Sequence, residues 1–282
     1  QGINKSYRYT GAVSFNYQFN NYFSARTIVG LTFDKMQEDM FVPQNGIIPD
    51  TLQSAVAYNR SGSNMDRFFS FYNNTSLSYN RTFNSIHRLQ VDLGYRYMDN
   101  SNENEYGRDY NSATDEFVTV GMGNGALRTI GGSAGKWNWL NTYLHADYTL
   151  HDKYFLSFNL AADGSSRFGT EAPHGLALGG VKYALNPSLA ASWLISSEKF
   201  FSGINFVDNL KLRASFGKVG NDDIGNYTAR QYYVSQNLIN MEGVVRGNIG
   251  NPALEWETED QLDFGVDASL FKERLSFSVD YL

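Results

Sequence analysis

The chain has 282 residues, a formal net charge of -6 and a pI near 5.2, and it contains no cysteine. The acidic balance supplies no basic stripe for a nucleic acid. The lack of cysteine excludes disulfides, thiolate metal sites and a lipid-bearing cysteine within these residues. Aromatic residues make up 15% although the mean hydropathy is -0.40, and no run of roughly 18 apolar residues could form a transmembrane helix. Apolar and polar residues are therefore interleaved, which is typical of a protein built from many strands.

Residues 13–33 alternate with a period of two and predict a first hairpin. Odd positions are mostly apolar, even positions are mostly polar, and the pattern is interrupted at Asn20-Asn21. Because successive side chains of a strand point to opposite faces, this pattern indicates two strands joined by a tight turn. The alternation is lost from about residue 35 to residue 66, where Pro43 and Pro49 indicate a first long loop.

A second pair of strands is predicted at residues 69–79 and 89–97, joined through Phe83-Asn84-Ser85. Asn73 is the polar exception on its apolar face. From Asp99 to about Gly135 the chain is polar and rich in glycine, which predicts a second long loop.

The most regular hairpin is predicted at residues 140–150 and 154–163, with a turn at His151-Asp152-Lys153. One face of each arm is apolar and the other is polar. Each arm has about the 9 to 11 residues that a tilted strand needs to cross a bilayer. A third irregular stretch is expected over 167–186, and Pro187 is expected to begin the next strand, because the first position need not donate to a ladder.

Three more strands complete the series, at residues 210–216, 262–270 and 275–281. A fourth long loop is expected over about 220–252, and Lys272-Glu273-Arg274 forms the last turn. Short and long connections therefore alternate along roughly ten strands, as in outer-membrane barrels with short periplasmic turns and long extracellular loops. A soluble sandwich or propeller, the alternative, has no reason to alternate its connections in this way. The short turns expected in the periplasm lie near Asn20, Asn84, Asp152, Phe201 and Glu273.

Charged residues within the strands fall on the polar faces, where a water-filled interior would receive them. They are Arg26, Asp92, Arg96, Asp147, Asp163, Lys211, Arg213, Asp263 and Asp267. The predicted fold class is an all-β antiparallel transmembrane β-barrel.

Motifs for chemistry are weak, and we expect no catalytic, cofactor-binding or metal site. Ser133 lies in a Gly-x-Ser-x-Gly pattern, but a hydrolase would need a strand before it and a helix after it. The four histidines, His87, His145, His151 and His174, lack zinc-ligand spacing. Asn221-Asp222-Asp223 offers oxygen donors for Ca²⁺, although a polar turn is the favoured interpretation. Trp256, between Glu255 and Glu257, suits a membrane interface.

Four stretches, taken in order, carry a resemblance to a known family. They are 153–156 (KYFL) with 162–169 (ADGSSRFG), 187–196 (PSLAASWLIS), 210–217 (LKLRASFG) with 220–221 (GN), and 250–257 (GNPALEWE). With this order and spacing the chain resembles the SusC/RagA family of TonB-dependent outer-membrane transporters of Bacteroidetes.

The resemblance implies a barrel of about 22 strands with a plugged lumen. It also implies a SusD-like surface lipoprotein as a lid, and TonB acting through the plug. No stretch resembles the plug or the first and last strands of the barrel, so residues 1–282 are expected to be a middle-to-late portion of the barrel domain. The expected role is import of oligosaccharides or peptides across the outer membrane, without enzymatic chemistry. The alternative is a structural or assembly component of a larger outer-membrane complex that does not import.

Aromatic residues in the outer loops and upper lumen are the candidates for contact with a glycan or peptide, because their rings stack on sugars and peptide side chains. They are Tyr106, Tyr110, Trp137, Trp139, Tyr227, Tyr232 and Tyr233. Packing within loops or in the interfacial aromatic girdle is the alternative role for each of them.

Overall fold

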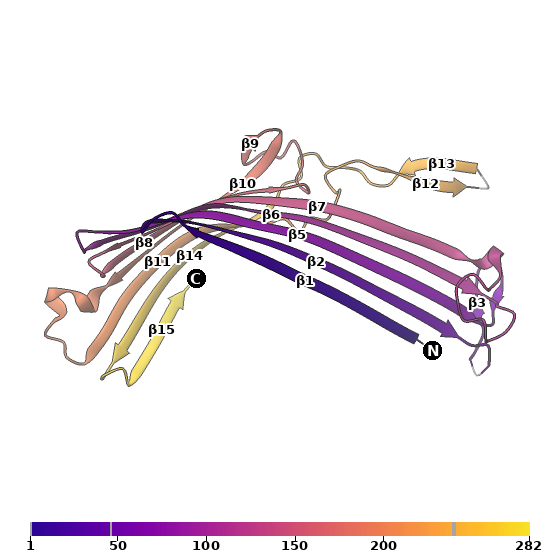
Figure 1. Ribbon diagram of the computed structural model, residues 1–282, viewed down its shortest axis with the longest axis horizontal. Helices are drawn as coiled ribbons and strands as arrows, with labels where there is room; N and C mark the ends of the chain where they lie inside the picture. The colour runs from indigo at the N-terminus through magenta and orange to yellow at the C-terminus, as the bar shows by residue number, and fades with distance from the viewer. Residues whose placement is uncertain (1, 46, 239–240) are drawn as a thin grey trace. The chain divides into compact units, whose positions relative to one another are not determined.

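In the computed structural model, the described residues are 2–45, 47–238 and 241–282. They form one antiparallel sheet of 11 strands, in which consecutive long strands lie side by side and the short β9 pairs with β10 (Figure 1). The long strands follow the order β1 (Gly2–Gln18), β2 (Phe23–Val42), β5 (Arg60–Phe83), β6 (His87–Tyr110), β7 (Thr129–Leu150), β8 (Tyr154–Ser165), β10 (Val181–Leu194), β11 (Val207–Asn221), β14 (Glu257–Leu270) and β15 (Leu275–Tyr281). The expected series of roughly ten meandering strands is thus confirmed.

Shorter elements lie in the connections. They are the paired strands β3 (Asp50–Thr51) and β4 (Val56–Ala57), the strand β9 (Leu176–Leu178), the hairpin of β12 (Tyr233–Leu238) and β13 (Met241–Arg246), and three 3-10 helices, η1 (Gly125–Leu127), η2 (Ile195–Ser197) and η3 (Lys199–Phe201). The long loops expected over 35–66 and 220–252 include residues 46 and 239–240, which lie outside the described residues. In the part of the chain that the structure describes, no helix is long and apolar enough to cross a membrane.

The predicted tight turns are present at the short connections. At the first turn, the side-chain oxygen of Asn20 accepts hydrogen bonds from the backbone N–H groups of Tyr22 and Phe23 at 2.8 and 3.0 Å. Asn84 and Ser85 have positive φ angles of 49° and 62°. Positive φ at both central residues is what a two-residue hairpin turn requires, so the local sequence chemistry determines these turns.

Several strands extend into regions that were predicted to be loops. β2 continues to Val42, β5 begins at Arg60, β6 continues to Tyr110 and β7 begins at Thr129. The predicted loop boundaries near residues 35, 66, 99 and 135 were therefore wrong. Beyond a bilayer both faces of a strand meet water, so the alternation disappears from the sequence while the backbone ladder continues.

Pro187 does not begin its strand, contrary to the prediction. β10 begins at Val181, within the stretch 167–186 that was expected to be irregular, and Pro187 stands opposite Leu160 of β8. The ladder between β10 and β11 starts at Ser188, so Pro187 stands at the end of that ladder, where a missing N–H group is tolerated.

The predicted faces of the strands agree with the cross-strand register, in which apolar residues stand opposite one another, as Leu144 does opposite Leu160 and Phe158 opposite Leu189. One face presents large apolar side chains to the surroundings, as a lipid-facing surface does. Exposed members include Phe15, Leu31, Leu77, Leu93, Leu156, Phe158, Leu189, Leu212, Phe216, Leu262, Phe264, Phe277 and Val279. Asn73, the polar exception on this face, donates hydrogen bonds to the Thr27 hydroxyl and the Ile28 carbonyl oxygen. Its polar atoms are satisfied within the sheet, as an apolar medium requires.

The chain forms two compact units. Unit 1 consists of Gln1–Val13, Val29–Tyr72 and Met98–Trp137. Unit 2 consists of Ser14–Ile28, Asn73–Tyr97 and Asn138–Leu282. A small buried cluster within unit 2 consists of Phe168, Ala172, Ala184 and Trp256, with Ile224 packed against it.

The face assignment predicts that Leu160→Arg impairs folding into a bilayer, because a lipid-facing Arg costs about 2 to 4 kcal/mol near the membrane centre. Ala161→Arg is the control, since Ala161 is two positions from Asn159 and shares the polar face of β8 with it. We expect a lower yield of heat-modifiable, folded protein for Leu160→Arg alone when the full-length chain is refolded into vesicles. Equal yields for both variants would contradict the assignment.

Candidate functional site

The polar face of the sheet carries side-chain hydrogen bonds that cross from strand to strand. On β7 and β8, one ring nitrogen of His145 meets Asn159 and the other meets Asp147. Asp147 also accepts a hydrogen bond from Ser157, and Asn159 donates to the Ser188 hydroxyl of β10 at 3.1 Å. His145 stands directly opposite Asn159 in the ladder, the position where cross-strand side chains interact most strongly. Three neighbouring strands are therefore linked on this face.

Tyr143 of β7 reaches across a whole strand on the polar face. Its hydroxyl donates to Asn74 Oδ1 of β5 at 3.2 Å, passing over Gly94 of β6. A Cβ atom added at Gly94 would lie 2.6 Å from the Tyr143 hydroxyl oxygen. The Arg96 guanidinium lies 4.8 Å from the centre of the Tyr143 ring. Glycine at this position thus permits one side chain to join three strands.

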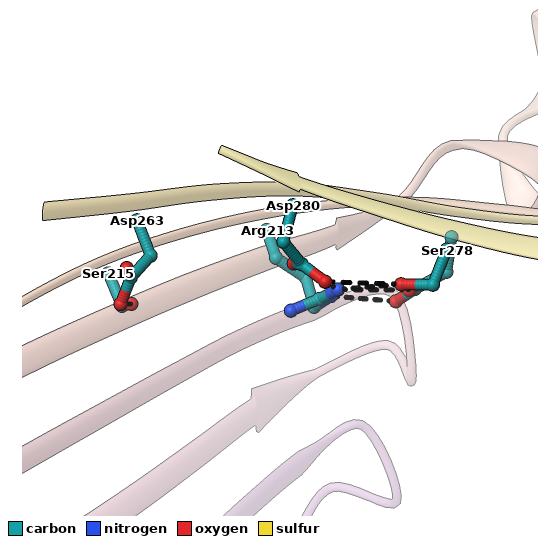
Figure 2. Close-up of polar contacts among 6 residues, drawn as sticks. Arg213, Ser215, Asp263, Ser278 and Asp280 are labelled. Atoms are coloured by element: carbon teal, nitrogen blue, oxygen red, sulfur yellow. Dashed lines mark hydrogen bonds and ion pairs between the residues drawn. The ribbon is translucent and has the colours of Figure 1, made fainter. Parts of the chain in front are cut away.

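Arg213 of β11 makes a second crossing of the same kind (Figure 2). Its guanidinium donates to Asp267 of β14 at 2.7 and 3.0 Å, and to Asp280 of β15 at 2.8 Å. Gly265 stands opposite both Arg213 and Asp280, and a Cβ there would lie 2.7 Å from the guanidinium carbon. Ser278 donates to Asp267 at 2.7 Å, which ties β15 to the network. Bidentate pairs of this kind orient the side chains as well as neutralising charge.

Three connections meet in what we call the loop junction, formed by residues 165–175, 220–226 and 250–256. Phe168 and Trp256 are 8% and 7% exposed, and their ring centres are 4.9 Å apart. The backbone N–H of Gly169 donates to the Leu254 carbonyl oxygen at 2.7 Å, and that of Glu171 donates to the Pro252 carbonyl oxygen at 2.8 Å. Trp256 was expected at the membrane interface; it is instead buried in this junction, because the segment before β14 folds against the segment after β8.

Arg167, in the segment after β8, links this segment to residues 220–226, which follow β11. Its Nε donates to the Asn226 side-chain oxygen at 2.8 Å and its Nη1 donates to the Asp222 carbonyl oxygen at 3.3 Å. The Arg167 side chain is 15% exposed and lies 3.7 Å from the Asp223 carboxylate. The favoured interpretation of Asn221-Asp222-Asp223 as a polar turn agrees with the Asn221 side-chain oxygen, which accepts the Asp223 backbone N–H at 3.1 Å.

A cavity of about 190 Å³ lies beside the loop junction. Its walls are Trp139, Asp163, Phe168, Ala184, Asn186, Gly220, Asn221, Asp222 and Trp256. Asp163 accepts hydrogen bonds from Asn141 and Asn186, each at 2.7 Å. One oxygen of Asn186 and one of Asp222 are buried without a hydrogen-bond partner among the described residues. Carboxylate and amide side chains therefore line this cavity beside aromatic rings.

A second ordered set of loops lies in unit 1. The Asp109 side chain is 1% exposed and accepts backbone hydrogen bonds from Gly121 and Gly123 at 2.8 and 2.9 Å. Arg128 donates to the same carboxylate at 3.1 Å. Burial alone would raise the pKa of Asp109, but these hydrogen bonds together hold it below its ordinary value. The carboxylate therefore fixes the connection between β6 and β7.

The seven aromatic candidates occupy different places. Trp139 lines the cavity beside the loop junction, whereas Tyr106 lies over Gly131 and Tyr232 lies over Gly247. Asn248 links Tyr227 and Tyr232, since it donates to the Tyr227 carbonyl oxygen at 3.4 Å and accepts the Tyr232 N–H at 3.1 Å.

Like Tyr106 and Trp139, the other three candidates, Tyr110, Trp137 and Tyr233, lie in strands rather than in loops. Tyr110 ends β6 and its carbonyl oxygen accepts the Asn124 N–H at 2.7 Å, and Trp137 is half-buried in β7. Tyr233 begins β12 and accepts a hydrogen bond from Gln231 at 2.7 Å. The contact of any of the seven with a substrate stays a prediction.

Sequence reasoning missed Phe168, Trp256 and Asp222 as parts of one site. The signal was present, since Phe168 and Trp256 lie in two of the stretches that carry the family resemblance, but no period or spacing indicated that these stretches meet. Ser133 lies inside β7 and no helix follows it, so the strand-to-helix turn of a nucleophile elbow is not formed there. The predicted loop at Ser133 was therefore wrong.

Comparisons with known proteins agree with this architecture. A family model described as "TonB dependent receptor-like, beta-barrel" matches residues 1–282. TonB-dependent receptor P39 of Formosa agariphila is 31% identical over 288 residues, which cover 95% of this chain and 26% of P39. TonB-dependent receptor SusC of Bacteroides thetaiotaomicron is 28% identical over 145 residues, which cover 48% of this chain and 13% of SusC.

Solved structures share the fold. A chain of the RagAB peptide transporter superposes with a TM-score of 0.85 at 21% identity, covering 99% of this chain and 30% of that chain. The ferric-catecholate import receptor Fiu of E. coli K12 superposes with a TM-score of 0.53 at 11% identity, covering 98% of this chain and 40% of that chain. The present chain thus spans 26% of P39 and 30% of the RagAB chain.

The packing of the loop junction predicts that Gly169→Ala loosens it, because a Cβ at Gly169 would collide with the Pro252 carbonyl oxygen. We expect faster cleavage by trypsin after Arg167 in the full-length chain. Gly203→Ala is the matched control, since nothing lies within 4 Å of a Cβ placed there. Unchanged cleavage in Gly169→Ala would show that the junction does not depend on this close approach.

The Asp109 site predicts a pH dependence. Its pKa is lower in the folded chain than in the unfolded one, so its stabilisation is complete above the ordinary value of about 3.9 and is lost as the pH falls through the lower folded value. Pepsin should therefore cleave residues 111–128 faster as the pH falls below about 4. Asp109→Ala removes the acceptor of three backbone N–H groups, at a cost of about 1 to 3 kcal/mol, and should weaken this pH dependence. Glu116→Ala, an exposed carboxylate in the same loop, should retain it.

Proposed function

The chain belongs to the TonB-dependent receptor β-barrel family of outer-membrane proteins, and from this membership we propose that it forms the lumen wall of a SusC-like importer of oligosaccharides or peptides. The resemblance to the SusC/RagA family, the barrel fold and the location in the outer membrane, all expected from the sequence, are confirmed by the same findings. Its substrate, its partners and its place in the whole barrel are parts of the proposal.

The two-faced sheet is the observation that carries this proposal. Its apolar face suits lipid, and its polar face holds paired charges such as Arg213 with Asp267 and Asp280. A water-filled lumen must bind a passing solute weakly enough to release it. Of the nine charged residues predicted on the polar face, Arg213 and Asp267 pair with each other, whereas Asp147 and Asp163 accept hydrogen bonds from neighbouring neutral side chains. A hydrogen-bonded polar wall of this kind suits the passage of polar solutes.

Two features bear on where a substrate would be recognised. The cavity beside the loop junction combines the Trp139 ring with the polar side chains of Asp163, Asn186 and Asp222. Sugar hydroxyls and peptide N–H groups are both donors, and both classes have faces that pack on an indole ring. We therefore assign the first contact with substrate to this cavity.

Two partners and a larger barrel belong to the proposal. β1 and β15 are the edges of the long strand path, and every residue of both strands is exposed. Unpaired edges do not persist in lipid, so further strands of the whole protein would complete the barrel. A SusD-like lipoprotein would cover the extracellular loops, and TonB would act through a plug in the remaining part of the protein. RagAB, with one chain of which this chain shares its fold, is a peptide transporter.

Growth on defined nutrients tests import. The full-length gene is deleted, then restored with or without the TonB-contacting segment, and the strain is grown on single glycans or peptides. Growth that needs this segment on at least one nutrient supports import. Undiminished growth on every nutrient would favour the alternative role in a larger outer-membrane complex.

Trp139→Ala tests the assigned contact in the same strain. Loss of one aromatic contact of about 0.5 to 1.5 kcal/mol predicts substrate affinity lower by about two- to tenfold, measured by titration of the purified complex. Leu140→Ala, the next residue along β7 on the opposite face, should leave affinity unchanged. Equal affinities for Trp139→Ala and the parent would place recognition elsewhere.

A further inference from the structure

Arg81 is a cation on the apolar face of the sheet. It lies near the end of β5 (Arg60–Phe83), close to the short turn at Asn84, and its side chain is exposed. Positions 77, 79 and 81 share one face of the strand, so Arg81 is on the same face as Leu77 and Tyr79. Short turns lie on the periplasmic side in this family of folds. Arg81 therefore faces the lipid at the periplasmic end of the barrel wall.

Two aromatic rings hold the Arg81 side chain. The guanidinium carbon lies 4.7 Å from the centre of the Tyr22 ring and 4.7 Å from the centre of the Phe83 ring. Cation–π contacts use the face of a guanidinium, whereas its five N–H groups lie in the plane at its edge. The rings thus fix the side chain while its donors stay available at the surface.

Arg88, across the same turn from Arg81, has a carboxylate partner. Arg88 lies on the polar face of β6 and pairs with Asp152 at 3.2 Å. Within the described residues no carboxylate lies within ion-pair distance of Arg81, and Asp152, in the turn after β7, pairs with Arg88 instead. A guanidinium at a lipid surface needs an anion, and the protein supplies none here.

Aromatic pairs mark the depth of Arg81 in the membrane. Phe23 and Tyr79 have ring centres 4.8 Å apart, and Tyr17 and Phe19 have ring centres 4.9 Å apart. Aromatic girdles lie at the boundary between hydrocarbon and headgroups. Arg81 is two residues beyond Tyr79 along the strand, which is about 7 Å toward the periplasm. Its guanidinium therefore lies at the level of the lipid phosphates.

We propose that Arg81, Tyr22 and Phe83 form a binding site for the phosphate of a phospholipid headgroup in the periplasmic leaflet. The guanidinium edge donates two parallel N–H bonds to two phosphate oxygens, which is the geometry that Arg favours with phosphate. The acyl chains of the same lipid run along Tyr79 and Leu77. This site is separate from the lumen and independent of the proposed transport.

Arg81→Gln and Arg88→Gln form a matched pair, because both remove one positive charge at the same end of the same hairpin, on opposite faces. The full-length protein is purified from each strain with its partners, and bound phospholipid is counted by native mass spectrometry. We expect Arg81→Gln to lose about one phospholipid per protein, and Arg88→Gln to retain the parent's number. Equal lipid counts in the three proteins would overturn the proposal.

A comparison of two lipids tests whether the phosphate is the group that Arg81 binds. Delipidated protein is titrated with phosphatidylglycerol or with a phosphate-free galactolipid carrying the same acyl chains. The parent should prefer the phospholipid at least tenfold, and Arg81→Gln should lose that preference. Inorganic phosphate at millimolar concentration should not displace the lipid; displacement would mean that the site binds free phosphate instead.

Arg81→Lys keeps the charge but cannot donate two parallel N–H bonds to one phosphate, so we expect a preference for the phospholipid between those of the parent and Arg81→Gln. Because this variant preserves the charge, it still tests the proposal if Arg81→Gln fails to fold. If Arg81→Lys prefers the phospholipid as strongly as the parent does, the bidentate geometry is contradicted. If both variants keep the parent's preference, the proposal as a whole is overturned.

Discussion

Backbone hydrogen bonding between neighbouring strands is the interaction on which the rest of this structure depends, because hydrocarbon offers no water to an unpaired N–H or C=O group. Each long strand of the path lies beside its neighbours in the chain, so the ladder is made by hairpins with few long-range crossings. Once the ladder is fixed, the pleat assigns every side chain to one of two faces. The turns at Asn20 and Asn84 determine the register of their own hairpins, as the turn at His151-Asp152-Lys153 does for β7 and β8, where a shift of one residue would bring Asp147 to the lipid.

The ladder also constrains how the polar face can be neutralised. Adjacent strands are about 4.8 Å apart, so side chains on alternate strands are separated by a whole strand. Gly94 and Gly265 remove the obstacle, and Tyr143 and Arg213 reach over them to Asn74 and Asp280. These glycines are needed for close approach and not for backbone conformation. Substitution at either position would break links among three strands, although the backbone pairing itself could persist.

Where a strand separates lipid from water, the sequence was sufficient to predict its position and its faces, since burial in lipid requires the period of two. Beyond the bilayer the requirement disappears, and the prediction ended β6 at Asp99 although its ladder continues to Tyr110. Turn chemistry was likewise predictable from residues such as Asn20. The loop junction was not, because Phe168 and Trp256 are 88 residues apart and contacts between distant loops leave no local pattern. The sequence predicted which face carries the charged residues, but it did not predict which of these residues pair with each other.

The division between wall and loops has a functional consequence. The wall is determined by demands that any outer-membrane barrel shares, so its pairs, such as Arg213 with Asp267, carry little information about a substrate. The loop junction depends on particular contacts, among them the approach of Gly169 to the Pro252 carbonyl oxygen and the bond from Arg167 to Asn226. A change in one of these three connections moves the other two, and with them the walls of the cavity at Trp139. The cavity to which we assign substrate contact therefore depends on the packing of the junction, and not on the ion pairs of the wall.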